Sequence, residues 1–391
     1  MIDVGIISIN IHSLYLNYGA ALHSFAFQKY LDSLGINSVI VDYKSKHFGN
    51  MLLDRPAIAF LKGHKRITTI LSALLNTPSF KRKYKTFNAF YAANCKMVDN
   101  NGEPYTYDFF NKQNEKINFV FPIVVCESDV IWSPKTSNGF DRVFFCDYPC
   151  FKNKIKVAYA PSISNTYLTK TEEEEFKKLL ENFDYLSSRE KQTAEYVNTI
   201  TGRKCVHVLD PVLLLDEKDY VPYFEEQKFS KYLLVYNVMR NDKKMLLLAK
   251  KIAKKRNLKL IEISDYVRNK IDHKTLTGRS IGEFLWLIKN SDYFITNGFH
   301  GVCFSILFKK DFLVFERDGV DLKVKSLLEN LKLEDCFVFQ SQIDSYIDNY
   351  KKIDWENVFN LLNIQRKDSM HYINESIVNN IRGGGRLYSV I

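Results

Sequence analysis

The sequence DYFITNGFHGVCFSILFKKDFLVFE, residues 292–316, decides the fold. A short apolar run leads into a turn at Asn297 and Gly298, a second apolar run is long enough for a helix, and a third, at 311–316, is strand-like. Runs of this kind predict a strand, a helix and a parallel strand with a right-handed crossover. The four residues 297–300, Asn-Gly-Phe-His, would then join the strand to the helix.

The first forty residues show the same alternation. Residues 4–10, VGIISIN, form a short apolar run, residues 18–35 have helical spacing and end at Gly35, and residues 36–43 form the next apolar run. Two strands that flank a helix in this way belong to a β-α-β unit, which predicts a parallel sheet.

The chain divides into two alternating series. A polar stretch between Asp216 and Phe229 separates them, and the alternation resumes with the apolar run at 232–238. We therefore predict the α/β class, with two Rossmann-like domains that face each other across a cleft at the carboxyl ends of their strands. The predicted parts are an N-terminal α/β domain at 1–216, a C-terminal α/β domain at 229–345 and a C-terminal helical tail at 346–391.

The composition predicts a globular protein with large hydrophobic cores. Of 391 residues 46% are apolar, and the formal net charge is +10. We see neither a basic leader nor an apolar run near the roughly 20 residues that span a bilayer, so we expect a soluble, cytoplasmic protein. The seven cysteines are scattered, and the close pair Cys146 and Cys150 lacks a second pair at zinc-site spacing, so we expect no metal.

Positive charge gathers in residues 61–91. The cations that flank the apolar centre of this segment are Lys62, Lys65, Arg66, Lys81, Arg82, Lys83 and Lys85. A solvated helix face explains such a pattern, and so does a surface for an anionic substrate or anionic lipid. Nucleic acid is not expected, because no nucleic-acid-binding motif accompanies the charge.

Two residues lie where an anion would be favourable. His300 follows a predicted strand at the start of a helix, where the first N–H groups carry partial positive charge. That field favours a neutral imidazole, whereas a bound anion would favour the protonated form; a histidine that only caps the helix would lie in the same place. Arg189 follows a strand-like run and suits a phosphate or carboxylate, or a salt bridge with Glu190.

Other polar residues also follow predicted strands. Asn17 begins the first helix, where capping accounts for it, and Asp129 with Trp132 would form a sugar-binding pair if both faced a cleft. Lys323 lies near a helix start, a position that favours a cation only beside an anion. The chain lacks the G-x-G-x-x-G, P-loop, H-E-x-x-H and G-x-S-x-G motifs, so nothing indicates a dinucleotide enzyme, an ATP-binding P-loop, a zinc protease or a serine hydrolase.

Taken together, these segments resemble the polysaccharide pyruvyl transferase family. The matching pieces are, in order, NYGAALHSFAFQKYLDSLG (17–35), ESDVIWSP (127–134), VAYAPSI (157–163), SSREKQTAEYV (187–197), VLDPVLLLD (208–216), SDYFITNGFHGVCFSILF (291–308) and KVKSLLENL (323–331). Their order and spacing extend over most of the chain. The resemblance implies a fold similar to the two-domain GT-B glycosyltransferases.

The resemblance also implies an activity. Established members transfer the pyruvyl group of phosphoenolpyruvate to two hydroxyls of one sugar, forming a cyclic ketal and releasing phosphate. The acceptor would be a bacterial capsular or exopolysaccharide repeat unit, carried on polyprenyl diphosphate at the inner membrane face, with residues 61–91 in peripheral contact with the membrane. Phosphoenolpyruvate is then a co-substrate and no cofactor is expected. A GT-B glycosyltransferase that uses a sugar nucleotide and a non-catalytic glycan-binding protein are the alternatives.

Site residues follow from the same resemblance. His300 would be the proton-transfer residue, as acid or as base, and Asp129 a second catalytic candidate that holds acceptor hydroxyls. The donor, on the C-terminal side, would be bound by Arg189, Lys323, Asn297, Gly298, Gly301 and Arg240. The acceptor, on the N-terminal side, would be bound by Asn17, Tyr18 and Trp132.

The chain departs from the family pattern at three places. Gly298 stands where one form of the motif has a donor-binding arginine, so another cation, among Lys323, Lys325 and Arg240, must meet the phosphate. Glu-Ser-Asp at 127–129 replaces the usual Gly-Ser-Asp, and His23 replaces a glutamine.

Overall fold

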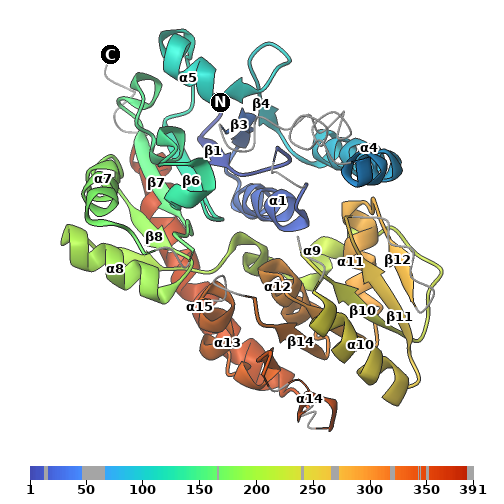
Figure 1. Ribbon diagram of the computed structural model, residues 1–391. Helices are drawn as coiled ribbons and strands as arrows, with labels where there is room; N and C mark the ends of the chain where they lie inside the picture. The colour runs from blue at the N-terminus through green and yellow to red at the C-terminus, as the bar shows by residue number, and fades with distance from the viewer. Residues whose placement is uncertain are drawn as a thin grey trace.

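Two parallel sheets, each covered by helices, make up the molecule (Figure 1). The computed structural model describes residues 1–12, 16–45, 67–164, 167–238, 242–265, 273–317, 322–341, 343, 345–348 and 352–384. The predicted α/β class with two doubly wound parallel sheets is confirmed.

The first sheet has the strand order β4-β2-β1-β6-β7. Its strands are β1 (Val4–Ser8), β2 (Ser38–Val41), β4 (Met97–Val98), β6 (Ile123–Glu127) and β7 (Ile155–Tyr159). A bridge between Val157 and Tyr185 continues this sheet toward the pair β8 (Leu186–Ser188) and β9 (Cys205–His207). The chain order reverses between β1 and β6, which makes the carboxyl end of these strands the expected ligand edge.

The second sheet repeats this winding, with the order β12-β11-β10-β13-β14-β15. Its strands are β10 (Tyr232–Tyr236), β11 (Lys259–Ile263), β12 (Lys274–Leu276), β13 (Tyr293–Thr296), β14 (Phe312–Phe315) and β15 (Phe337–Val338). The order reverses between β10 and β13, so His300, which follows β13, lies at the switch point of this sheet.

Helices alternate with these strands. Those of the first half are α1 (Tyr18–Ser33), α4 (Ile67–Asn94), α5 (Tyr107–Gln113), α6 (Pro134–Ser137), α7 (Lys170–Leu180), α8 (Lys191–Thr201) and α9 (Glu217–Tyr220). Those of the second half are α10 (Lys243–Lys255), α11 (Ile281–Lys289), α12 (Phe299–Leu307), α13 (Leu322–Asn330) and α14 (Ser345–Asp348). The chain ends in α15 (Trp355–Ile373), a π-helical turn (Asn374–Val378) and α16 (Asn379–Gly384). A small sheet pairs β3 (Tyr43–Lys44) with β5 (Tyr105–Thr106).

One hydrophobic core runs through both halves. Ile6 of β1 and Leu234 of β10 belong to the same cluster, together with Leu22 of α1 and Phe304 of α12. The opposite faces of the two sheets pack into separate cores. Because both faces of each main strand are covered, the strands read as nearly continuous apolar runs. The shared core places α1 of the first half against α12 of the second.

Aromatic and ionic contacts fix α1 and α4 against the second half. The ring of Tyr18 stacks on Phe284 of α11 with centroids 4.1 Å apart, and its hydroxyl donates to the carbonyl of Arg279 at 2.9 Å. Lys83 of α4 pairs with Asp265, which follows β11, and its ammonium lies 4.5 Å from the Tyr18 ring centroid. The two halves therefore meet through packed side chains as well as through the connecting chain.

The C-terminal helix α15 returns to the first sheet (Figure 1). Arg366 donates to the carbonyls of Leu213 and Leu215, each at 2.7 Å, and Tyr372 donates to the carbonyl of Ala158 at 2.9 Å. Of the helical segment predicted at 346–391, α15 thus docks on the first half of the chain. The predicted boundary between 216 and 229 falls in the connection between β9 and β10, where α9 lies.

Candidate active site

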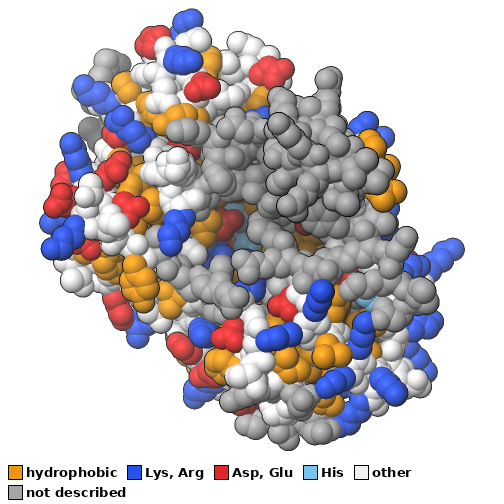
Figure 2. All heavy atoms as spheres, viewed as in Figure 1, with side chains coloured by type: hydrophobic (Ala, Val, Ile, Leu, Met, Phe, Trp, Pro, Cys, Tyr) orange, Lys and Arg blue, Asp and Glu red, His pale blue; other side chains and the backbone are white. Residues whose placement is uncertain are grey.

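Polar residues of both halves meet at the carboxyl ends of the strands. Asp129 follows β6, Arg189 follows β8, Asp210 comes shortly after β9, and His300 lies in the first turn of α12. Acidic, basic and histidine side chains gather in a hollow near the middle of the face shown in Figure 2. This is the edge at which open parallel sheets bind ligands.

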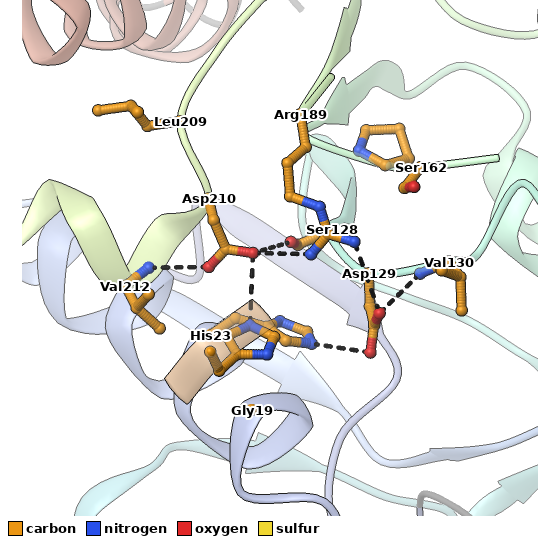
Figure 3. Close-up of polar contacts among 12 residues, drawn as sticks. Gly19, His23, Ser128, Asp129, Val130, Ser162, Arg189, Leu209, Asp210 and Val212 are labelled. Atoms are coloured by element: carbon orange, nitrogen blue, oxygen red, sulfur yellow. Dashed lines mark hydrogen bonds and ion pairs between the residues drawn. The ribbon is translucent and has the colours of Figure 1, made fainter. Parts of the chain in front are cut away.

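Asp210 is the centre of this cluster (Figure 3). Its Oδ2 accepts hydrogen bonds from Arg189 Nη1 at 2.9 Å and from Ser128 Oγ at 3.1 Å, and lies 3.4 Å from His300 Nε2. Its Oδ1 accepts from the backbone N–H of Val212 at 3.2 Å. Burial alone would raise the pKa of Asp210, but His300 and Arg189 hold it far below its usual range. Asp210 is therefore ionised, and sequence reasoning missed it.

The guanidinium of Arg189 is buried among three carboxylates. Besides Asp210, its Nε lies 3.3 Å from Glu190 Oε1, and its Nη2 lies 3.7 Å from Asp129 Oδ1. Its plane also lies 4.6 Å from the ring centroid of Phe299. Burial alone would lower the pKa of Arg189, yet these carboxylates raise it above its usual value. The predicted salt bridge with Glu190 is present, and Nη2 has no hydrogen-bond partner among the described residues.

His300 lies between Asp210 and the backbone of α1. A Cβ added to Gly19 would come 1.9 Å from His300 Nδ1, so only glycine leaves room for the imidazole. Burial lowers the pKa of His300, and nearby His23 lowers it further, against the opposing effect of Asp210. The neutral imidazole expected at this helix start is thus favoured, with burial as the main cause.

A strained turn presents Asp129. Ser128 and Asp129 have φ values of 50° and 57°, consecutive left-handed conformations that cost energy for non-glycine residues. Two backbone hydrogen bonds of 2.8 Å hold the turn, from Ser128 N–H to the Tyr159 carbonyl and from Ser162 N–H to the Asp129 carbonyl. Strain that the surroundings hold in place is typical of functional loops.

The Asp129 carboxylate points into the cluster. Its Oδ2 lies 4.0 Å from His23 Nε2, on the side away from Arg189 (Figure 3). Burial alone would raise the pKa of Asp129, but Lys323, Arg189 and His23 lower it below its usual value. Asp129 is therefore placed as an ionised group at the edge of the cluster, with part of its side chain exposed.

Lys323 of α13 completes the positive side. Its ammonium lies 5.8 Å from the ring centroid of Phe299, and no carboxylate of the described residues forms an ion pair with it. Burial and the nearby charge of Arg189 lower the pKa of Lys323 to about 8, so it remains mostly charged at neutral pH. Arg317, which sequence reasoning missed, also lowers this pKa and donates to the carbonyl of Asn297 at 3.5 Å.

A second histidine lies beneath the cluster. His23 Nδ1 is 2.9 Å from each carboxylate oxygen of Glu127, and both side chains are fully buried. Ser24 donates to the same carboxylate at 3.3 Å. The replacements at His23 and Glu127 were visible in the sequence as two separate departures, and the structure joins them in one contact.

Three predicted donor residues lie around the start of α12: Asn297 and Gly298 precede the helix, and Gly301 lies in its first turn. Asn297 donates to Asn237 Oδ1 at 3.1 Å and accepts from Val238 N–H at 2.7 Å, which ties the ends of β13 and β10 together. A Cβ at Gly298 would come 2.5 Å from Val238, and one at Gly301 would come 2.5 Å from Thr296 Oγ1. These contacts explain through packing why asparagine and glycine occupy these positions. That the three residues contact the donor stays a prediction.

Two predicted acceptor residues require correction. Trp132 is completely buried, with its ring 5.5 Å from that of Phe176, and Tyr18 is buried against Phe284. Neither ring offers a face to a sugar, because neighbouring aromatic rings occupy the space around it. Asn17 caps α1 by accepting from Gly19 N–H at 3.0 Å.

One further candidate cation, Lys325, lies away from the cluster. The ammonium of Lys325 lies 4.9 Å from the ring centroid of Phe337, at the end of the second sheet. Arg240 falls outside the described residues.

A match to a protein-family model shows to which family the chain belongs. The model for polysaccharide pyruvyl transferases matches residues 17–319. The chain belongs to this family. The matched range includes every member of the cluster except Lys323, and the resemblance inferred from the sequence pieces is confirmed. No curated protein sequence matches the chain significantly.

Solved structures of other proteins are similar to this transferase over nearly the whole chain. Arabidopsis thaliana UGT89C1 complexed with UDP-L-rhamnose has a TM-score of 0.49 at 10% identity, covering 96% of this chain and 98% of that one. The S. aureus MnaA–UDP structure has a TM-score of 0.48 at 9% identity, covering 98% and 97%. UDP-N-acetylglucosamine 2-epimerase from Rickettsia bellii has a TM-score of 0.47 at 8% identity, covering 96% and 99%.

Replacing Gly19 by alanine is expected to lower the activity of the transferase about 100-fold, because the added methyl group displaces the His300 imidazole from Asp210. Steady-state turnover, with the melting temperature as a check on folding, measures the effect. Ser33→Ala, at the exposed end of the same helix, is the control and should retain full activity. A fully active Gly19→Ala enzyme would show that the position of His300 is not critical.

Proposed function

We propose that this pyruvyl transferase uses phosphoenolpyruvate as donor and joins its pyruvyl group to two hydroxyls of one sugar as a cyclic ketal, releasing phosphate. The observation that carries the proposal is the position of Lys323, a partly buried cation without an ion pair among the described residues, near Phe299, which directly precedes a neutral histidine at a helix start. A small multiply charged anion is the ligand that such a site favours.

The two anionic groups of the donor need separate positive sites. Lys323, with Arg317 close by, would contact the phosphate, and the first turn of α12 adds N–H groups that no side chain caps. Arg189 Nη2, which makes no hydrogen bond among the described residues and lies 3.7 Å from Asp129 Oδ1, would reach the carboxylate of the donor. In this assignment Lys323, rather than Arg189, is the main cation for the donor, because Arg189 mainly pairs with the carboxylates of the protein itself.

The transfer needs proton movements that the cluster can perform. A hydroxyl of the sugar loses its proton as it attacks C2, and the methylene carbon of the donor gains one to become the methyl group. Phosphate then leaves, the second hydroxyl closes the ring, and its proton departs with the phosphate. His300, neutral and beside ionised Asp210, would accept the first proton and pass it to the methylene carbon, and the bound anion stabilises the protonated imidazole between these two transfers.

The acceptor would approach from the first half of the molecule. Asp129, ionised and partly exposed, is the group of this half that would hold the sugar hydroxyls by accepting their hydrogen bonds. In the second half, Lys323 and Arg317 would hold the donor, and His300 would move the proton. This arrangement requires no metal or cofactor, because cationic side chains balance the charge of the leaving phosphate.

Mass spectrometry tests the proposal. Nitrophenyl and lipid-linked glycosides are incubated with the protein and phosphoenolpyruvate, and the expected product is heavier than the acceptor by pyruvic acid less one water. Phosphate release should depend on the acceptor. Sugar transfer from a sugar nucleotide without any reaction of phosphoenolpyruvate would instead identify a glycosyltransferase.

We also propose that α4 contacts an anionic membrane surface that carries a polyprenyl-linked acceptor. No described helix is long and apolar enough to cross a bilayer. The exposed side of α4 carries Leu74 and Leu75 together with Lys81 and Lys85, a combination of apolar and basic groups that suits anionic lipid. Residues 61–66 of the predicted basic segment fall outside the described residues.

Neutralising Lys81 and Lys85 by glutamine is expected to weaken binding to anionic vesicles about 30-fold, since each lysine near such a surface contributes about 1 kcal/mol. Arg82 and Lys83 are left unchanged, because they pair with Glu283 and Asp265. Vesicle sedimentation at low and high salt measures the effect. Lys177→Gln/Lys178→Gln on exposed α7 is the control, and equal binding by both double variants would contradict a role for α4.

A further inference from the structure

The buried pair of His23 and Glu127 lies outside the reaction as described so far. We propose that His23 is a positioning residue of the proposed transfer reaction: a buried imidazolium, held by Glu127, whose charge keeps the imidazole of His300 in its neutral, proton-accepting form. The inference rests on the proposed role of His300 as a base, but it concerns a charge coupling that can be measured without any substrate.

The contacts of His23 favour a charged ring. Its Nδ1 lies 2.9 Å from both oxygens of Glu127, which leaves the other nitrogen, Nε2, as the second possible site of a proton. That Nε2 is buried, has no hydrogen-bond partner among the described residues, and lies 4.0 Å from Asp129 Oδ2. An imidazolium places one N–H toward each of the two carboxylates, whereas a neutral ring leaves one side without a proton. Burial alone would lower the pKa of His23, but Glu127, Asp129 and Asp210 raise it above its usual value.

The two histidines are close enough to influence each other. Their ring centroids are 5.9 Å apart, and the ring planes are inclined by 23°. A positive charge at this distance opposes protonation of the second ring. Each ring also has its own carboxylate, Glu127 for His23 and Asp210 for His300. When the surroundings of two like groups move their pKa values apart, one group can act as an acid and the other as a base.

The other charges around His300 do not reverse this effect. The charged groups that act on His300 are His23 from α1, Asp129 from the loop after β6 and Asp210 after β9. Arg189 acts on both of these carboxylates, and Lys323 from α13 acts on Asp129. Asp210 favours a protonated His300, but Arg189 is paired with the same carboxylate oxygen. His23 is the cation that stacks on His300, so the loss of its charge should raise the pKa of His300.

Histidine-selective isotope labelling and NMR titration test the coupling. In the unmodified protein, His23 should stay protonated through neutral pH, and His300, assigned by its loss in His300→Gln, should titrate below its usual value. In His23→Gln the titration of His300 should move upward by about one pH unit or more, as expected for unit charges about 6 Å apart at an effective dielectric of about 20 to 40.

A second variant and a control make the test independent of folding defects at one position. Glu127→Gln removes the counter-ion, so His23 should lose its proton more easily, and the titration of His300 should again move upward. His371→Gln, in exposed α15, should leave His300 unchanged. A neutral His23 at neutral pH in the unmodified protein, or an unmoved His300 in both variants, would overturn the inference.

Kinetics supply a second readout. The acid limb of kcat/KM should move upward with His300 in His23→Gln and Glu127→Gln, while KM for phosphoenolpyruvate changes less than kcat. An absence of pyruvyl transfer with an intact titration shift would disprove the proposed function and leave the coupling in place. Normal transfer without a titration shift would disprove the coupling alone.

Discussion

Alanine at position 300 is expected to lower kcat about 1,000-fold and to leave phosphoenolpyruvate bound nearly as tightly as before. General acid–base groups contribute about 100- to 10,000-fold, and His300 is the neutral imidazole at the switch point of the second sheet. Donor affinity should persist because Lys323, Arg317 and the start of α12 remain in place. Phosphate release gives kcat, and calorimetry with phosphoenolpyruvate gives the dissociation constant.

A matched substitution separates this effect from a general loss of structure. His371→Ala removes a histidine that is 71% exposed in the side chain, and it should leave both kcat and donor affinity unchanged. Unchanged product formation by His300→Ala would refute the assignment of the proton transfer to His300. Loss of donor binding together with turnover would place His300 in the binding site instead.

Removal of Arg189 is expected to have the largest effect on stability. Arg189→Ala leaves Asp210, Glu190 and Asp129 buried without their shared cation, and breaking such buried pairs costs about 3 to 5 kcal/mol in the free energy of unfolding. Arg189→Lys should recover little, because an ammonium cannot match three carboxylates with a planar set of donors. Urea denaturation monitored by circular dichroism measures the change.

The pH dependence gives this prediction a second signature. The folded-state pKa of Asp210 is depressed, so its contribution to stability is present above its unfolded pKa of about 4 and is lost as the pH falls through the folded value. Without Arg189 the folded-state pKa of Asp210 should rise. The free energy of unfolding of the variant should therefore increase less above about pH 4 than that of the unmodified protein. Arg142→Ala is the control: Arg142 is 52% exposed and paired with Asp147, so the loss should stay below about 1 kcal/mol. Equal stability of Arg189→Ala and the unmodified protein would contradict the anchoring role.

The sequence was sufficient to predict the sheets and the place of His300 at a strand-to-helix junction. Strands buried on both faces must be apolar along their whole length, and helices between them must follow a different period, so alternation alone predicts the architecture. His300 could be found because its signal is local: a strand, a turn with Asn297 and Gly298, and a helix follow one another without a gap.

The remaining members of the cluster depend on contacts between distant parts of the chain. His23 and Glu127 are separated by 104 positions, and each alone has an ordinary explanation as a helix or strand residue. Asp210 precedes a proline in a short turn, which is a common place for an aspartate. Trp132 was misassigned because its nearness to Asp129 in the sequence says nothing about direction, and its ring points into the core.

The return of α15 to the first sheet has a consequence for how the chain is made. Leu209 and Ala158 receive their partners Ser369 and Tyr372 only after 160 and 214 further residues have been synthesised, on the order of ten seconds or more at ordinary translation rates. Until then, the growing chain leaves one side of its first Rossmann unit uncovered. The ribosome must therefore translate α15 before the first unit is complete, and a nascent chain of this protein should depend on chaperones for longer than one whose domains close in order.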